Sequence, residues 1–180
     1  MIAPDGVMDV FLQPGDFFFG DEFTRVRTLL GSCVAITLWH PHKRIGGMCH
    51  YMLPTRARPD AAAALDGRYA DEAVAMFLDE VSAAWTSPQE YVVKIFGGGR
   101  QFTQWAPEAG VRVADRNVEV GLELLAQHRL PVTAQHLGGN GHRQVILDLW
   151  SGDVWVKHVD RTEPGPRTRL HAGVVPQGAG

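Results

Sequence analysis

The sequence predicts a single α/β domain in which a mostly antiparallel, mixed sheet is packed against at least two helices. Three observations support this fold class. Strand-like apolar runs alternate along the chain with two amphipathic helical patterns. Turn residues join neighbouring strands at two places, which favours antiparallel pairing. The chain has 180 residues, 45% of them hydrophobic, enough for one substantial core and too few for two ordinary domains.

The first predicted hairpin pairs residues 34–39 with residues 45–53, and Pro41 between them suits a type I turn. If the turn centres between Pro41 and His42, Cys33 lies directly opposite His50. Directly opposed side chains share one face, with Cβ atoms about 4.5 to 5.5 Å apart. A slip of one residue would instead put the two on opposite faces. The sequence therefore predicts a thiol within hydrogen-bond reach of an imidazole.

Strand and helix signals alternate beyond this hairpin. Residues 55–66 show little periodicity and are expected to form a surface loop. A helix is predicted over 69–85, with its apolar face formed by Ala73, Met76, Phe77, Val81 and Trp85. The elements expected after it are a strand at 91–96, a helix at 115–128 with Val118, Leu122 and Leu125 facing inward, a strand at 132–137, and a hairpin of 145–150 with 154–159.

The domain is expected to cover residues 1–160. Residues 161–180 are rich in Pro, Gly and Arg and lack apolar periodicity. Such a composition is typical of a disordered tail.

Two interpretations of Cys33 remain open from the residues alone. A free cysteine in an apolar strand is commonly a small core residue. Against this, Gly31 and Ser32 precede Cys33, and Gly46 and Gly47 lie on the partner strand. Glycine weakens a strand unless something approaches the backbone closely, so these neighbours favour a reactive site.

The same residues carry a resemblance to a known family. Residues 28–35 and 46–54 resemble the active-site motif of the CheD family, the chemoreceptor glutamine deamidases of bacterial chemotaxis. Further motifs follow in the family's order over roughly residues 8–158: Leu12-Gln-Pro-Gly-Asp16, Lys94-Ile-Phe-Gly-Gly-Gly99, Asp115-Arg-Asn117, and Leu137-Gly-Gly-Asn140 with Arg143.

The resemblance implies roles for particular residues. Cys33 matches the family's nucleophile, His50 its general base, and Thr28 is the nearest candidate for its catalytic threonine. The sequence departs from the family at Cys49, where an Asn commonly precedes the His. Strand alternation puts Cys49 on the face opposite His50, and therefore away from Cys33.

The implied activity is that of a protein-glutamine glutaminase. Cys33 would attack a glutamine side-chain amide, ammonia would leave, and water would release glutamate from a thioester. Backbone amides around Gly31 and Ser32 are candidates for binding the oxyanion, and Gly47 is a further candidate for contact with the substrate. The expected substrate is the cytoplasmic domain of a chemoreceptor, and a CheC-type phosphatase is a possible second partner.

Composition excludes several other classes. The net charge is −3 and no run of Lys or Arg is present, so nucleic acid is not an expected partner. No apolar segment is long enough to cross a membrane, and the first residues do not form a signal peptide, so a cytoplasmic protein that is not inserted in a membrane is expected. The histidines and cysteines lack metal-ligand spacing, and residues 97–99 lack the pattern of a phosphate loop. Neither a metal nor another cofactor is expected.

Two alternatives to a deamidase remain. A non-enzymatic chemotaxis adaptor that binds receptors or a CheC-type phosphatase would need the fold without a reactive Cys33. A thiol hydrolase of another class, such as a peptidase, would share the Cys and His but cut backbone amides. The family resemblance favours the deamidase.

Overall fold

The computed structural model describes residues 1–56, 63–101, 107–160 and 164–170, with the side chains of 107–111 and 164–170 left out of the description. Two five-stranded sheets and two α-helices make up this part of the chain. The elements are β1 (Met8–Leu12), β2 (Phe17–Gly20), β3 (Thr24–Leu30), β4 (Val34–His40), β5 (Ile45–Tyr51), α1 (Ala70–Ala83), the 3-10 helix η1 (Pro88–Glu90), β6 (Val92–Gly97), α2 (Pro107–Gln127), β7 (Val132–Leu137), β8 (His142–Asp148), β9 (Asp153–Val159) and β10 (Pro164–Leu170).

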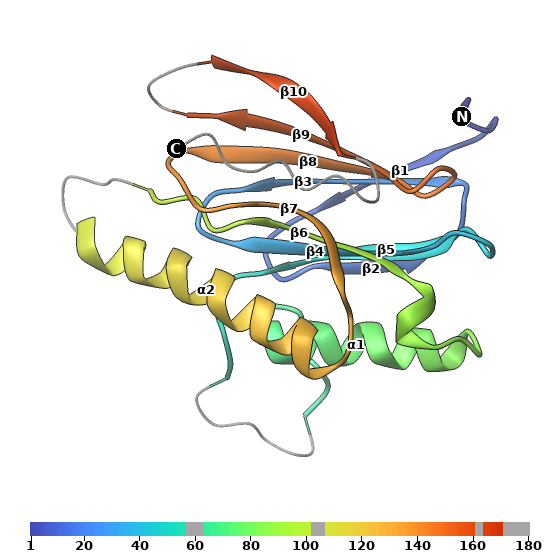
Figure 1. Cartoon of the computed structure of the whole chain (residues 1–180), viewed down its shortest axis with the longest axis horizontal. Coiled ribbons are helices and arrows are strands. Elements are labelled where there is room, and N and C mark those ends of the chain that lie inside the picture. Colours follow the sequence, from blue (N-terminus) through green and yellow to red (C-terminus); the bar gives the residue numbers. More distant parts are fainter. Residues whose placement is uncertain (57–62, 102–106, 161–163, 171–180) are drawn as a thin grey trace.

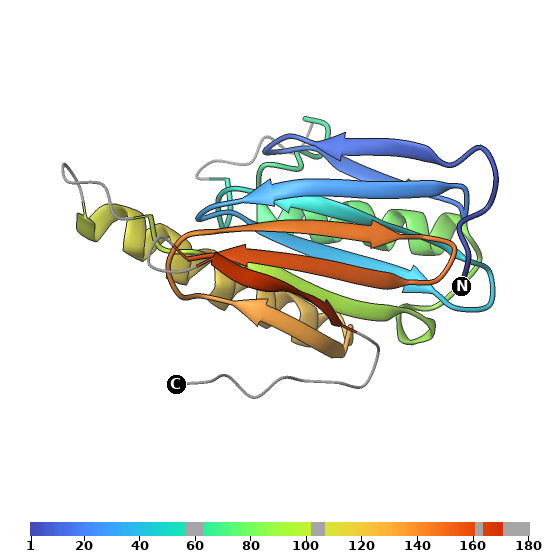
Figure 2. The ribbon, with the colours of Figure 1, turned by 90° about the horizontal axis from the view of Figure 1, so that it is seen from above.

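The elements form three layers (Figure 1). Sheet A has the strand order β1-β3-β8-β9-β10, and sheet B has the order β2-β5-β4-β6-β7. Each sheet is antiparallel except for one parallel pair, β1 with β3 in sheet A and β6 with β7 in sheet B. Sheet A packs on one face of sheet B, and both helices cover the other face; Figure 2 shows sheet A from above with the helices behind it.

The α/β fold class predicted from the sequence is confirmed, but the strands form two sheets rather than one. Sheet B is apolar on both faces because its strands contribute to two separate cores. Alternate residues of β4, such as Ile36 and Leu38, pack against the helices, whereas Ala35 packs against sheet A. A strand that is buried on both faces reads as a continuous apolar run, so its sequence does not reveal what covers each face.

The first predicted helix is confirmed as α1, with one correction. Ala73, Phe77 and Val81 are buried as expected, but Trp85 is 94% exposed. The helix ends at Ala83, and Trp85 has a positive φ of 55°, which turns its side chain away from the predicted face. The apolar periodicity therefore extends beyond the end of the helix.

The second helix is longer than predicted, because α2 begins at Pro107 rather than at residue 115. Proline is tolerated in the first turn of a helix, where its missing N–H has no partner to lose. The strand predicted at 132–137 is β7, and the last predicted hairpin corresponds to β8 and β9. Part of the surface loop expected at 55–66 lies outside the described residues.

The segment 161–180 also differs from expectation where it is described. Residues Pro164–Leu170 form β10, which pairs with β9 at the edge of sheet A, so disorder is not observed for these seven residues. Proline is compatible with an edge strand, since one side of such a strand makes no ladder hydrogen bonds. The rest of the predicted tail lies outside the described residues, and the domain boundary remains a prediction.

Candidate active site

Thr28, Cys33 and His50 lie at one end of the space between the two sheets. Thr28 belongs to β3 of sheet A and His50 to β5 of sheet B, and both are almost fully buried, at 0% and 1% exposure. Cys33 lies in the three-residue segment 31–33, where the chain leaves sheet A and enters sheet B at β4. The candidate nucleophile is therefore at a crossing between sheets, and it is partly buried.

The hairpin of β4 and β5 is confirmed, but its register differs by two residues from the predicted one. His50 pairs with Ala35 rather than with Cys33. The loop contains the four residues 41–44, and Arg44 adopts a positive φ of 53°. Arginine rarely has a positive φ, so the sequence does not predict this conformation. Because side chains alternate with a period of two, Cys33 still shares a face with His50. Cys33 lies one residue beyond the last ladder pair, diagonal to His50. Diagonal neighbours in a ladder typically have Cα atoms about 7 to 8 Å apart.

A hydrogen-bond chain fixes the tautomer of His50. The Thr28 hydroxyl donates to the backbone oxygen of Leu12 at 2.8 Å. The hydroxyl oxygen of Thr28 also lies 2.7 Å from Nδ1 of His50. The Leu12 carbonyl can only accept, and the hydroxyl has one proton to give, so Nδ1 of His50 must carry the proton of the second bond. Nε2 of His50 is then the acceptor nitrogen of the ring.

Nε2 of His50 is buried and has no hydrogen-bond partner. The hydrogen bond from the Cys33 thiol that the sequence suggested is therefore not formed in this state of the site. Catalytic hydrogen bonds are commonly long in the absence of substrate and tighten when it binds. A cysteine beside an unpartnered basic nitrogen is chemically capable of acyl transfer.

Burial keeps both groups neutral. It lowers the pKa of His50 to about 4, although the nearby Asp16 carboxylate acts in the opposite direction. Burial also raises the pKa of the Cys33 thiol. The resting site thus holds a thiol and a neutral imidazole rather than a thiolate and an imidazolium.

The backbone of His50 is held by the turn that follows β1. Its N–H donates to the carbonyl of Asp16 at 3.0 Å, and its own carbonyl accepts the N–H of Gly15 at 2.7 Å. Leu12, which orients Thr28, ends the strand before this turn. The segment Leu12–Asp16 therefore positions both the base and the residue that orients it.

The segment Gly31–Cys33 turns its carbonyl groups into the protein. Backbone N–H groups of the loop Gly97–Gly99 donate to the carbonyls of Gly31 and Cys33, each at 2.9 Å. The Ser32 carbonyl accepts the side-chain amide of Asn117 at 3.2 Å. In a trans peptide the N–H points opposite to the carbonyl. The N–H groups of Ser32 and Cys33 are therefore directed away from these partners.

Gly47 is not brought to this site. It lies in β5, where it pairs with Leu38 of β4 and Phe19 of β2, five residues along β4 from Cys33. A Cβ at Gly47 would lie 1.9 Å from the Phe18 carbonyl oxygen. Its lack of a side chain is thus required for strand packing, and it lies away from the candidate site.

Cys49 lies on the opposite face of β5, as the sequence predicts. It is fully buried in the core between sheet B and the helices, and burial raises its pKa to about 12. Its neighbours on the flanking strands are Ile36 and Phe17.

Two buried polar residues near the site have no role in the sequence-based prediction. Asn117 of α2 contacts the Ser32 carbonyl, and Arg143 of β8 donates to Nδ1 of His136 at 2.7 Å and to the Gly138 carbonyl. Asn117 is 0% exposed and Arg143 is 1% exposed. Both residues belong to motifs of the family resemblance, and these motifs were the only sign in the sequence that they matter. A motif does not indicate which atoms its residues contact.

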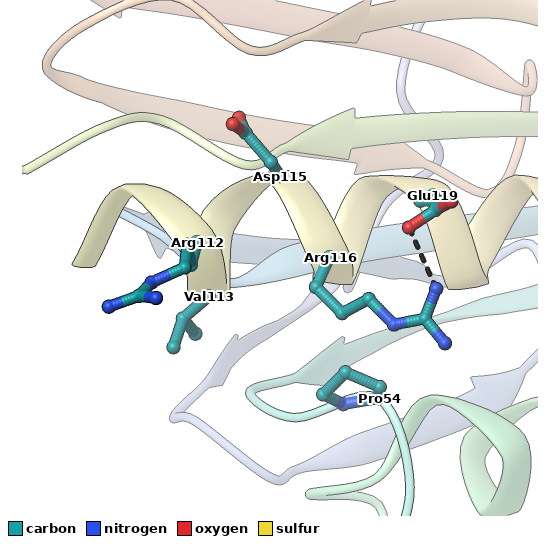
Figure 3. A pocket seen from close by; sticks show the side chains of 6 residues that line it. All are labelled: Pro54, Arg112, Val113, Asp115, Arg116 and Glu119. Carbon is teal, nitrogen blue, oxygen red and sulfur yellow. Dashed lines mark hydrogen bonds and ion pairs between the residues drawn. The ribbon is translucent and has the colours of Figure 1, made fainter. Parts of the chain in front are cut away.

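An open pocket of about 480 Å³ lies between Pro54 and residues 112–119 of α2 (Figure 3). Its walls do not include Cys33 or His50; they are Pro54, Arg112, Val113, Asp115, Arg116 and Glu119. Arg116 and Glu119 form an ion pair at 2.7 Å within it.

Within the described residues, no three His, Cys, Asp or Glu side chains are grouped so that they could hold a metal ion. Neither α-helix in that part of the chain combines the length and apolar character needed to span a bilayer.

Comparison with known proteins identifies the family. The family model for CheD chemotactic sensory transduction matches residues 52–158. A protein of Pseudomonas savastanoi pv. phaseolicola named probable chemoreceptor glutamine deamidase CheD is 53% identical over 159 residues, which cover 88% of this chain and 89% of the relative. One of Dechloromonas aromatica, named probable chemoreceptor glutamine deamidase CheD 3, is 52% identical over 154 residues, covering 86% and 89%.

A more distant relative has the same kind of name. The probable chemoreceptor glutamine deamidase CheD 1 of Leptospira interrogans is 35% identical over 168 residues, which cover 90% of this chain and 99% of the relative. The family model begins just after His50, at residue 52. The alignments with the relatives are long enough, relative to this chain of 180 residues, that each of them must include residues 28–50. The chain belongs to the CheD family.

Proposed function

We propose that this chain is a chemoreceptor glutamine deamidase that uses Cys33 as nucleophile, His50 as general base and Thr28 to orient His50. The observation that carries the proposal is the state of the imidazole. Its Nδ1 is bonded to Thr28, while Nε2 is buried, free of partners and on the same strand face as Cys33. The printed names of the relatives supply the reaction and the substrate class.

The first half of the reaction transfers the acyl group to sulfur. As the Cys33 sulfur attacks the side-chain carbonyl carbon of glutamine, the thiol proton passes to Nε2 of His50. The tetrahedral intermediate collapses when His50 returns this proton to the amide nitrogen. The C–N bond breaks, ammonia leaves, and a γ-glutamyl thioester remains on Cys33.

The second half releases glutamate. Water attacks the thioester carbon and gives a proton to Nε2, and the C–S bond breaks as the sulfur takes that proton back. A neutral resting pair suits this cycle, because the low pKa of His50 keeps Nε2 able to accept a proton at the start of each half. The raised pKa of Cys33 requires proton transfer to accompany the attack.

Backbone amides are the candidates for binding the oxyanion of both intermediates. The N–H groups of Ser32 and Cys33 point away from the carbonyl partners described above, which leaves them available to a substrate oxygen. A Cβ at Gly31 would lie 3.3 Å from Cδ of the Gln101 side chain.

The proposed substrate is the cytoplasmic domain of a chemoreceptor, so the proposal requires a cytoplasmic protein. A CheC-type phosphatase remains a second proposed partner, implied by the family resemblance alone. A non-enzymatic adaptor is the alternative function, and it would use the same binding surface without turnover.

Incubation with a purified chemoreceptor cytoplasmic fragment tests the proposal. Peptide mass mapping should find glutamines converted to glutamate, with one ammonia released per conversion, and Cys33→Ala is the matched control. Binding of the fragment without conversion by the wild-type protein would favour the adaptor and overturn the proposal.

A further inference from the structure

Asn117 is a fully buried polar residue of α2 that the mechanism above does not use. Its Nδ2 atom donates two hydrogen bonds, to the Ser32 carbonyl at 3.2 Å and to the Met52 carbonyl at 2.7 Å. Both partners can only accept, so the orientation of the amide group follows from its surroundings.

The two carbonyls belong to the chain segments that carry the nucleophile and the base. The Ser32 carbonyl is part of the peptide bond to Cys33, and Met52 follows His50 by two residues. The ladder of β4 and β5 ends at Val34 paired with Tyr51. Asn117 therefore bridges the two segments just beyond the last ladder pair, where the chain at Cys33 leaves the sheet.

The position of Asn117 is itself fixed by β5. The Tyr51 hydroxyl donates to the Asn117 carbonyl at 2.6 Å, and a Cβ at Gly121 would lie 2.2 Å from that hydroxyl oxygen. Helix α2 thus lies close against β5 at the residue next to His50. This anchor uses the main chain of Asn117 and leaves its amide group for the two carbonyls.

The other end of the amide group is not satisfied. Oδ1 of Asn117 is buried and has no hydrogen-bond partner. A buried polar atom without a partner is unfavourable, and an apolar side chain would avoid it. An asparagine at this position is therefore explained by the two hydrogen bonds that its N–H groups donate. One of them can hold the peptide plane between Ser32 and Cys33.

We propose that Asn117 is a positioning residue for the deamidase reaction, which holds the Ser32–Cys33 peptide so that the Cys33 N–H faces the substrate oxygen and the nucleophile keeps its distance from His50. The inference rests on the proposed function. Misplacement of a reacting group by about 1 Å can cost about a hundredfold in rate, even when the altered residue does not touch the substrate.

The test compares Asn117→Ala and Asn117→Leu with Cys49→Ala. The Leu variant keeps the branching of the side chain without its polar atoms, and Cys49→Ala removes a buried side chain from the opposite face of β5 without changing the amide. Deamidation of a receptor fragment gives kcat and KM, iodoacetamide alkylation of Cys33 reports its intrinsic reactivity, and a melting curve reports folding. We expect the Asn117 variants to lose about 30- to 100-fold in kcat, with KM and alkylation within about threefold of wild type. Cys49→Ala should keep kcat within about threefold.

Each other outcome has a definite meaning. An unchanged kcat in the Asn117 variants, with an active wild type, would overturn this inference alone. An equal loss of kcat in Cys49→Ala, or loss of folding in both Asn117 variants, would assign Asn117 a structural role and also overturn it. An inactive wild type would overturn the proposed function, and this inference with it.

Discussion

The hydroxyl of Thr28 lies 2.7 Å from Nδ1 of His50, and this contact joins the two sheets inside the protein. Since the hydroxyl proton is already donated to Leu12, the contact selects the tautomer in which Nδ1 is protonated. A threonine thereby serves the purpose that a carboxylate serves in many hydrolases. It orients the ring without adding charge, which agrees with a pKa of His50 of about 4.

Thr28→Val should therefore lower kcat for deamidation by about 10- to 100-fold. Valine has the same shape but cannot accept the Nδ1 proton, and an unsatisfied buried donor costs about 1 to 3 kcal/mol of stability. Thr28→Ser keeps the hydroxyl and is the matched control, with kcat within about fivefold of wild type. Steady-state kinetics and melting curves on both variants test this. Equal activity in the Val and Ser variants would remove Thr28 from the proposed site.

Cys33→Ala should abolish turnover, with a loss of about a thousandfold or more, because every proposed step needs the sulfur. The variant should fold, since Cys33 is only partly buried and alanine fits an apolar strand end. Cys33→Ser should fail almost as completely, because its hydroxyl is a weaker nucleophile and His50 has a threonine rather than a carboxylate partner. The measurement is ammonia release from a receptor fragment. Turnover by Cys33→Ala above background would mean that the nucleophile is another residue.

Cys49→Ala should keep kcat within about threefold and lose about 1 to 2 kcal/mol of unfolding free energy. Its side chain is fully buried in the core next to the helices, on the face of β5 opposite His50. Truncating such a side chain removes apolar contacts without changing the site. Labelling of the native protein with a thiol reagent provides a second readout. Wild type should label once and Cys33→Ala not at all, and labelling of Cys49 in the folded protein would contradict its burial.

The sequence predicted the strands of the site well because alternation is a local property. The hairpin, the common face of Cys33 and His50, and the opposite placement of Cys49 all depend on a period of two. The exact register depended on Arg44, whose positive φ lengthens the loop. Arginine is not a residue that marks such a turn, so the error of two residues in pairing had no visible signal.

Contacts between distant segments could not be predicted in the same way. The family motif identifies Thr28 but gives no reason for its role. Its bond to His50 exists because β3 and β5 belong to sheets that face each other. Asn117 reaches the Ser32 carbonyl across 85 residues of sequence. Gly47, in contrast, lies on the strand predicted to pair beside Cys33, but its lack of a side chain allows β2 to pack against β5. Local patterns specify elements and faces, whereas the site is assembled by the packing of those elements.

Acid should destabilise the protein between pH 6.5 and pH 4 through the buried His50 and the partly buried His136. Burial lowers the pKa of both His50 and His136 to about 4, and Arg143 adds to the effect at His136. Their ordinary pKa is about 6.5, so in this window the unfolded chain binds more protons than the folded one. Stability therefore falls as the pH falls through the window and levels off below it. Each histidine contributes a slope of up to about 1.4 kcal/mol per pH unit.

His136→Asn should remove about half of this combined slope. An asparagine oxygen can replace Nδ1 as acceptor of the Arg143 Nε–H bond, so the variant keeps that contact while losing the titratable ring. The same exchange at the exposed His142 is the matched control for the substitution itself. Denaturant unfolding at a series of pH values between 4 and 7 gives the slopes directly. If His136→Asn retains the full wild-type slope, protonation of His136 is not coupled to unfolding, and the Arg143–His136 pair does not have the predicted acid sensitivity.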